Sequence, residues 1–262
     1  PSPQSPPSRG GEVPGQRVCR SDLIAIASTA LYSVQPVLTE AINSVGFRED
    51  LLATMFVLLS TLLYARGNLA ISILSYGMAL LSKESAFPVP LILIAYDYLY
   101  QRGLFLKRYL WYFLISALYL YLRFSLLYNP VEDTLIHEVP LLMRLTSIPV
   151  AIFYYIKLLL FPVSLVSNYP NFDFLLRPAI SVSLMAAIGF VILLIGLIKK
   201  RVLNKTAVFG ICWFTLTLLP VLNIVPIINP FAERFLYLPA IGFMLFIGNL
   251  QIKSSFTILK IA

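Results

Sequence analysis

Three short charged motifs separate apolar runs of this 262-residue chain. Their acids and bases are Glu40, Arg48, Glu49, Asp50, Lys83, Glu84, Glu233 and Arg234. Guanidinium and ammonium groups hold phosphates, and a carboxylate can take the proton of a hydroxyl group. If the fold brings these motifs together, they predict a site that binds an anionic ligand and activates an acceptor.

The composition predicts an integral membrane protein. Hydrophobic residues make up 59% of the chain, charged residues only 12%, and the mean hydropathy is +0.84. A soluble domain carries about 25% charged residues. The net charge of +8 is then the Lys/Arg bias of cytoplasmic loops and not a nucleic-acid surface. The single histidine, His137, has no Cys/His partners at metal-site spacing, so we expect no metal ligands.

The apolar runs predict an all-α polytopic protein with about eight spans. They are 22–38, 50–65, 69–82, 86–100, 109–128, 179–198, 206–222 and 235–250. Several are shorter than the ~20 residues of an ordinary span. They can still span if the bilayer is locally thinner or if flanking charged side chains snorkel to its surface. Residues 1–21 are Pro/Gly/Ser-rich in part and predict a disordered cytoplasmic tail. Residues 22–250 form the membrane module, and 251–262 a cytoplasmic end.

The run 141–162 decides the orientation of the chain. Arg144, Pro149, Lys157 and Pro162 interrupt it, which favours a helix lying on the outer interface. With the basic cluster at 199–201 cytoplasmic, all three motifs then lie on the outer side. If 141–162 crosses the membrane instead, every preceding loop changes side. We prefer the version in which it does not cross.

Two of the arginines are expected at helix starts, where the helix dipole disfavours a cation. Arg48 therefore needs a partner, either Glu40 in an ion pair that orders the loop or an anion from outside. Arg234 follows an apolar stretch broken by prolines, and irregular backbone near a membrane must be buried or line a polar cavity. Both positions suit a lipid-linked sugar phosphate, whose tail lies in the bilayer while its head reaches the cations.

Several stretches of the chain carry a family resemblance. They are Pro36-x-x-Thr39-Glu40-Ala41-Ile42-Asn43, Gly46-x-Arg48-x-Asp50-Leu51-Leu52-Ala53, Leu81-Ser82-Lys83-Glu84 with Tyr96-Asp97, and Ala232-Glu233-Arg234-Phe235-Leu236-Tyr237-Leu238-Pro239 with Gly242-Phe243. They resemble the transmembrane and tetratricopeptide-repeat-containing O-mannosyltransferases and their bacterial relatives, over about residues 22–250. The resemblance implies a GT-C glycosyltransferase with its site on the luminal or periplasmic face, in the endoplasmic reticulum or the bacterial inner membrane.

The resemblance also implies a polyprenyl-phosphate sugar donor of mannose type and protein hydroxyl acceptors. A divalent metal is left open. The candidate catalytic carboxylates are Asp50, Glu84 and Glu233. The candidate substrate-binding residues are Glu40, Arg48, Lys83, Arg234 and Tyr237.

The chain departs from the family pattern in three ways. The acidic pair of a first outer loop is missing, no repeats follow the last run, and Gln35 stands where a histidine is common. We expect a chain truncated at both ends. Two other functions stay open: a transporter or flippase of a lipid-linked or anionic solute, and a non-catalytic membrane scaffold. A transporter predicts charges at mid-membrane and paired inverted repeats.

Overall fold

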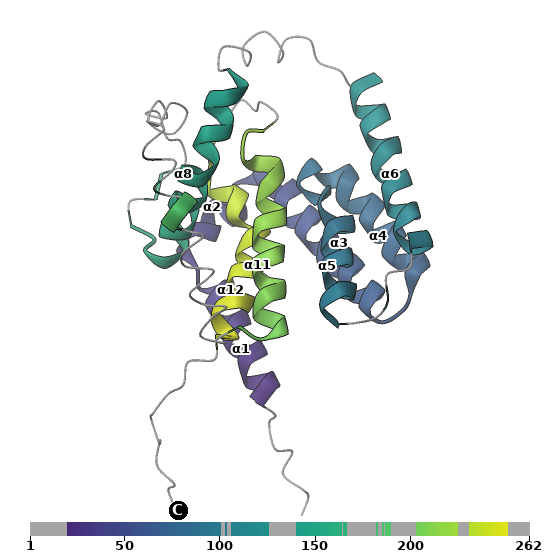
Figure 1. The fold of residues 1–262 in the computed structure, drawn as a ribbon, viewed down its shortest axis with the longest axis horizontal. Helices are drawn as coiled ribbons and strands as arrows, with labels where there is room; N and C mark the ends of the chain where they lie inside the picture. The colour runs from purple at the N-terminus through teal and green to yellow at the C-terminus, as the bar shows by residue number, and fades with distance from the viewer. Residues whose placement is uncertain are drawn as a thin grey trace, which may run out of the picture.

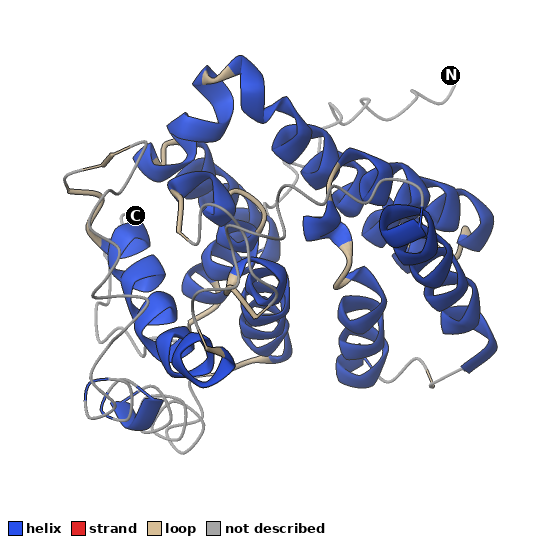
Figure 2. Cartoon of the chain, turned by 90° about the horizontal axis from the view of Figure 1, so that it is seen from above, coloured by secondary structure: helices blue, strands red, loops and turns tan. Residues whose placement is uncertain are grey.

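The computed structural model describes residues 20–100, 103, 106–125, 140–163, 165–166, 182, 185, 187–189, 203–224 and 231–250. Every regular element in these ranges is a helix, and no strand occurs among them (Figures 1 and 2). The predicted all-α class is therefore confirmed for the described chain. Residues 1–19 of the predicted tail, the predicted end and most of the run 179–198 lie outside the described residues, whereas Arg20 and Ser21 begin α1.

The helices follow the apolar runs closely. The α-helices are α1 (Arg20–Ser33), α2 (Thr39–Asn43), α3 (Arg48–Ala65), α4 (Leu69–Ser82), α5 (Val89–Tyr100), α6 (Leu106–Ser125), α8 (Leu141–Leu160), α11 (Lys205–Leu218) and α12 (Pro239–Gly248). Short 3₁₀ helices link them: η1 (Pro36–Leu38), η2 (Val45–Phe47), η3 (Glu84–Ala86), η4 (Leu219–Val221) and η5 (Glu233–Leu236).

Proline accounts for two of the boundaries that differ from the predicted runs. The run 22–38 ends as an α-helix at Ser33, because Gln35 precedes Pro36 and is extended. The run 235–250 begins inside η5 and becomes an α-helix only at Pro239, which suits a first helical turn. The three charged motifs therefore lie in the short segments α2, η3 and η5 and in the first turn of α3.

The helices pack into two halves that share α11 (Figure 1). One core joins η1, α8, η5 and α12 to Phe214 and Leu218 of α11. The other joins α3, α4, α5 and α6 to Phe209 and Trp213 of the same helix. Since α11 contributes side chains to both cores, it sets the position of one half against the other.

We call the two ends of the bundle the motif end and the Asp97 end. At the motif end α1, α4 and α11 finish and α3 and α5 begin, which places all three charged motifs there. At the Asp97 end α3 and α5 finish and α4 and α6 begin. Adjacent helices alternate in direction, so a charged segment recurs at the same end after every second helix.

Helix α8 covers nearly the whole of the run 141–162, for which the sequence predicted a helix. It is a continuous α-helix through Pro149, from Leu141 to Leu160. Among the described residues it is the one helix long and apolar enough to cross a membrane by length and composition. The helices α3 and α6 are of similar length, but charged residues lie in their first turns.

Both halves of α8 contact the motif end. The guanidinium of Arg144 donates from Nη1 to the carbonyl of Ile224, just after η4, at 3.1 Å. Near the other end of α8, the carbonyl of Leu159 accepts a hydrogen bond from Gln35 Nε2 at 2.8 Å, just before η1. Because both partners belong to the motif end, α8 packs over that end of the bundle.

Candidate functional site

An ion pair between Glu40 and Arg234 joins the first charged motif to the third. Arg234 Nη1 donates to Glu40 Oε1 at 3.0 Å, and the backbone N–H of Arg234 donates to Glu40 Oε2 at 2.9 Å. The two side chains are only 11% and 8% exposed. Both carboxylate oxygens are thus used, and two segments separated by 194 positions are tied together. The expected alternative, a Glu40–Arg48 pair, is not formed.

A second ion pair joins the first motif to the second. Lys83 follows α4 in an extended conformation, and its Nζ lies 2.6 Å from Asp50 Oδ2 and 3.4 Å from Glu49 Oε1. Asp50 is buried in the first turn of α3, where the helix dipole favours a carboxylate. The ammonium group of Lys83 therefore bridges two consecutive acids of α3.

Two phenylalanine rings bring the two ion pairs into one cluster. The Cζ atom of Arg234 lies 4.1 Å from the ring centroid of Phe47 and 5.1 Å from that of Phe235. Lys83 Nζ lies 6.0 Å from the same Phe235 centroid. A cation over an aromatic face is stabilised by the ring's negative surface. We refer to Glu40, Glu49, Asp50, Lys83 and Arg234, with these two rings, as the charged cluster.

The structure places the two arginines that were predicted at helix starts in different kinds of element. Arg48 is the first residue of α3, as expected. It is exposed and makes no hydrogen bond or ion pair to any described residue. Arg234 instead lies inside the 3₁₀ helix η5, five positions before α12 begins, so the helix-start prediction for it is wrong. Glu40 holds its guanidinium in place.

The remaining candidate residues are either tied to backbone or open to solvent. Glu233 is 3% exposed, and its Oε1 accepts the backbone N–H of Val166 at 2.6 Å, which anchors the segment after α8. The carbonyl of Tyr237 accepts the hydroxyl of Tyr32 at 3.0 Å. Glu84 begins η3, is exposed, and has no hydrogen bond or ion pair within the described chain. Of the three candidate catalytic carboxylates, Glu233 is the most constrained.

The charges of the cluster nearly cancel. Three carboxylates face two cations, and the exposed Arg48 would complete the balance. A guanidinium has five N–H donors, and only Nη1 of Arg234 is used by a described side chain. An anion could therefore bind through the remaining donors of Arg234 without displacing Glu40.

Sequence reasoning missed three partners in the cluster. Glu49 was recognised as part of the motif but not as a second carboxylate for Lys83. Phe47 and Phe235 were not identified, although each directly adjoins an arginine in the sequence, which was the available signal. No three His, Cys, Asp or Glu side chains in the described ranges come together as metal ligands.

Comparison of the chain with protein-family models, with curated proteins and with solved structures found no match. The sequence motifs and the geometry of the charged cluster are therefore the grounds on which a function can be inferred.

Proposed function

We propose that the chain is the membrane module of a glycosyltransferase that moves a mannose-type sugar from a polyprenyl phosphate to protein hydroxyl groups. The observation that carries the proposal is the charged cluster. Three motifs far apart in sequence, which together resemble those of the O-mannosyltransferases, contribute to one group of cations and carboxylates at one end of a helical bundle.

The proposed module is a polytopic bundle with the motif end on the outer face of the membrane. Its support is the large number of apolar side chains exposed on the bundle surface. They include Leu58, Leu62, Leu74, Met78, Leu110, Phe113, Leu114 and Leu118 of α3, α4 and α6. A soluble monomer rarely exposes such extended apolar surface, whereas lipid tails would cover it. The short helices then require a locally thin bilayer.

In this arrangement α8 is the outer interfacial helix and does not cross the membrane. Its contacts with Gln35 and Ile224 favour this placement, because both residues belong to the motif end. A helix that crossed alongside the bundle would be expected to reach the Asp97 end as well. With α8 outside, the segments carrying Glu40, Lys83 and Arg234 stay on one side.

The proposed reaction uses the cations and the carboxylates of the three motifs separately. The acceptor hydroxyl oxygen attacks the anomeric carbon, the bond from that carbon to the phosphate oxygen breaks, and polyprenyl phosphate leaves with the electron pair. Arg48, Lys83 and Arg234 stabilise the charge on the leaving phosphate. The hydroxyl proton goes to a carboxylate, for which Asp50 and Glu84 are better placed than the backbone-bound Glu233.

Donor binding would also prepare the base. Lys83 holds Asp50 at 2.6 Å. An incoming phosphate competes for the same ammonium group, and a Lys83 that turns to the phosphate frees Asp50 Oδ2 to accept a proton. Coupling of this kind would link the arrival of the donor to activation of the acceptor.

Binding of a polyprenyl-phosphate mannose to the purified full-length protein tests the proposal directly. Arg48→Ala is the informative variant, because Arg48 is exposed and its loss should not disturb the fold. Its matched control is Arg66→Ala, an exposed arginine at the Asp97 end. We expect binding to weaken at least about 10-fold for Arg48→Ala and to be unchanged for Arg66→Ala.

Transfer of radiolabelled mannose to a Ser/Thr peptide gives the second readout, with Arg234→Ala expected to abolish it. Absence of donor binding by the folded wild-type protein would refute the glycosyltransferase proposal. Equal donor binding by Arg48→Ala and wild type would remove Arg48 from the site.

A further inference from the structure

The Asp97 end carries many cations and few acids. The segments that lead into α4 (66–68), α6 (101–105) and α11 (199–204), and the first turns of these helices, contain no Asp or Glu. Their cations are Arg66, Arg102, Lys107, Arg108, Lys199, Lys200, Arg201 and Lys205. Among the described residues, the acids at this end are Asp97, which is buried, and Asp22 of α1, which packs on α12. The motif end, in contrast, pairs its cations with carboxylates.

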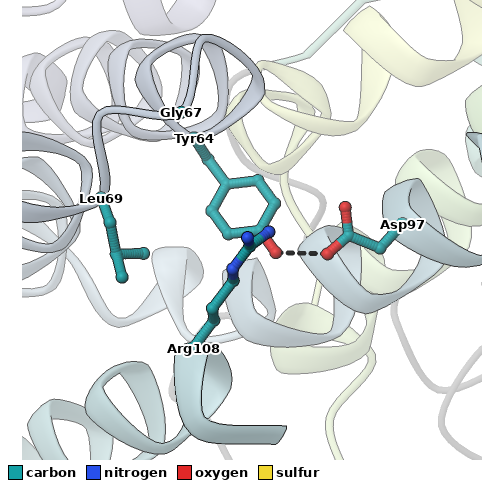
Figure 3. Close-up of a pocket in the computed structure, with 5 residues that line it drawn as sticks. All are labelled: Tyr64, Gly67, Leu69, Asp97 and Arg108. Atoms are coloured by element: carbon teal, nitrogen blue, oxygen red, sulfur yellow. Dashed lines mark hydrogen bonds between the residues drawn. The ribbon is translucent and has the colours of Figure 1, made fainter. Parts of the chain in front are cut away.

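The ends of four helices meet around these cations. Tyr64 from the end of α3, Asp97 from α5 and Arg108 from the start of α6 line one cavity (Figure 3). The hydroxyls of Tyr100, the last residue of α5, and Thr206, at the start of α11, lie 3.3 Å apart. The cationic segments therefore face the same side of the bundle, opposite to the motif end.

An apolar stripe on α3 leads directly to Arg66. Leu62 lies four positions before Arg66 and Leu59 seven, a spacing that puts the three side chains on one side of a helix. The helical course reaches Arg66, because its N–H donates to the carbonyl of Leu62 at 3.0 Å. All three side chains are exposed. The stripe on α3 thus ends in a guanidinium at the Asp97 end.

Helix α6 begins with the same arrangement. Lys107 is exposed in its first turn, and Leu110, Trp111 and Leu114 follow at three, four and seven positions, all of them exposed. The helix dipole disfavours a cation in a first turn, so the stability of α6 does not account for Lys107. Trp111 suits a membrane boundary, where tryptophan is enriched because its ring is apolar and its N–H is polar.

A cation at the end of an exposed apolar stripe has the chemistry that matches a phospholipid. In the proposed membrane placement, acyl chains cover the stripes, and the phosphate of each lipid then lies level with Arg66 or Lys107. Ammonium and guanidinium groups form charge-assisted hydrogen bonds with phosphate oxygens. With the motif end outside, the Asp97 end lies in the cytoplasmic leaflet, where anionic lipids attract such cations.

We propose that α3 and α6 select anionic phospholipids at the Asp97 end, with the acyl chains on the two apolar stripes and the phosphates on Arg66 and Lys107. The proposal rests on the membrane placement given above and not on glycosyl transfer. It makes the lipid contact of these two helices selective for headgroup charge, in addition to the apolar contact that any lipid provides.

Native mass spectrometry of the full-length protein in detergent tests the proposal. The protein is titrated with phosphatidylglycerol, which carries a net negative charge, or with phosphatidylcholine of the same acyl chains, which carries none. A cation near a lipid surface strengthens the binding of anionic lipid about 5-fold. We therefore expect phosphatidylglycerol to bind at least about 5-fold more tightly than phosphatidylcholine.

A double variant locates the binding. Arg66→Gln/Lys107→Gln removes one cation from each stripe and should weaken phosphatidylglycerol binding about 5-fold. Both side chains are exposed, so the variant should fold. Arg66→Lys/Lys107→Arg keeps the charges and should bind as wild type does. Lys205→Gln is the matched control: Lys205 is an exposed cation at the same end, but none of the large apolar side chains of α11 is exposed.

Equal affinity of the wild-type protein for phosphatidylglycerol and phosphatidylcholine would overturn the proposal. So would unchanged phosphatidylglycerol affinity in Arg66→Gln/Lys107→Gln, or an equal loss in Lys205→Gln, which would indicate diffuse attraction by the whole end. The double variant should still bind the polyprenyl-phosphate donor as wild type does. Failure of lipid selection therefore leaves the donor site standing, and failure of donor binding leaves lipid selection standing.

Discussion

Arg234 shows how one side chain links several segments. Its guanidinium pairs with Glu40 and lies against the rings of Phe47 and Phe235. A planar guanidinium can form these contacts together, whereas the compact ammonium of lysine cannot. The position thus requires arginine for geometry as well as for charge.

Removal of Glu40 is expected to destabilise the protein strongly. Glu40→Ala leaves Arg234 as a largely buried cation without its carboxylate, which costs about 3–5 kcal/mol. Unfolding in denaturant, followed by tryptophan fluorescence in detergent, measures the loss. Glu84→Ala is the control and should change stability by less than about 0.5 kcal/mol, because Glu84 is exposed.

The pair itself can be isolated by a double variant. If Glu40 and Arg234 stabilise each other, the double variant Glu40→Ala/Arg234→Met should lose less stability than the two single variants lose together. We expect a difference of about 0.5–3 kcal/mol. If the two single losses add up to the loss of the double variant, the contact between Glu40 and Arg234 contributes nothing to stability.

Close packing of α11 on α12 depends on two glycines. A Cβ atom added at Gly242 would lie 2.5 Å from Phe214 N and 2.6 Å from the carbonyl oxygen of Gly210. Both obstacles are backbone atoms of α11, so neither can move without shifting the helix. The short interhelical distance places α12, and η5 before it, against the rest of the bundle.

Gly242→Ala is therefore expected to lower stability by about 1–3 kcal/mol, because the added methyl group overpacks the helix contact. Gly77→Ala in α4 is the matched control, since nothing lies within 4 Å of its added Cβ. The control should be neutral or slightly stabilising, given that alanine favours helix more than glycine. Thermal unfolding of both variants measures the difference, and equal midpoints would contradict the packing argument.

The start of α11 depends on a side-chain cap. Asn204 Oδ1 accepts the backbone N–H of Ala207 at 2.7 Å, and its amide donates to Asn249 Oδ1 at 3.3 Å. Asn204→Ala should cost about 1 kcal/mol, as loss of an N-cap usually does. Asn68→Ala at the start of α4 is the control, because Asn68 makes no side-chain cap bond and should lose much less. Unfolding midpoints of the two variants provide the test.

At the scale of the whole molecule, the position of α8 decides how the bundle lies in a membrane. Contacts at both halves of α8 fall at the motif end, although its length would also allow it to cross. The two arrangements differ in a measurable way, because a crossing helix has its ends on opposite sides.

Labelling of single cysteines with a membrane-impermeant maleimide in intact cells distinguishes them. In a background without Cys19 and Cys212, we expect Leu142→Cys and Val163→Cys at the two ends of α8 to react from the outside, with Val45→Cys at the motif end. A cysteine at Asn68, at the Asp97 end, should react only after permeabilisation. Reaction of the two α8 positions from opposite sides would show that α8 crosses.

Local information was enough to predict the helices and the start of α3 at Arg48. Apolar runs interrupted by charged residues and prolines determine where helices can form, and this depends on near neighbours in the chain. One local prediction failed for a physical reason. Arg234 lies in a 3₁₀ turn because Pro239 delays α12.

The sequence by itself determined an all-helical chain with three charged motifs recurring between apolar runs. Only the tertiary structure decided which acid meets which base. Glu40 pairs with Arg234 and not with the nearby Arg48, because helix packing brings together groups 194 positions apart. The same holds for Asp97: the hydroxyls of Tyr64 and Tyr109 reach one oxygen of its carboxylate only because α3, α5 and α6 pack together.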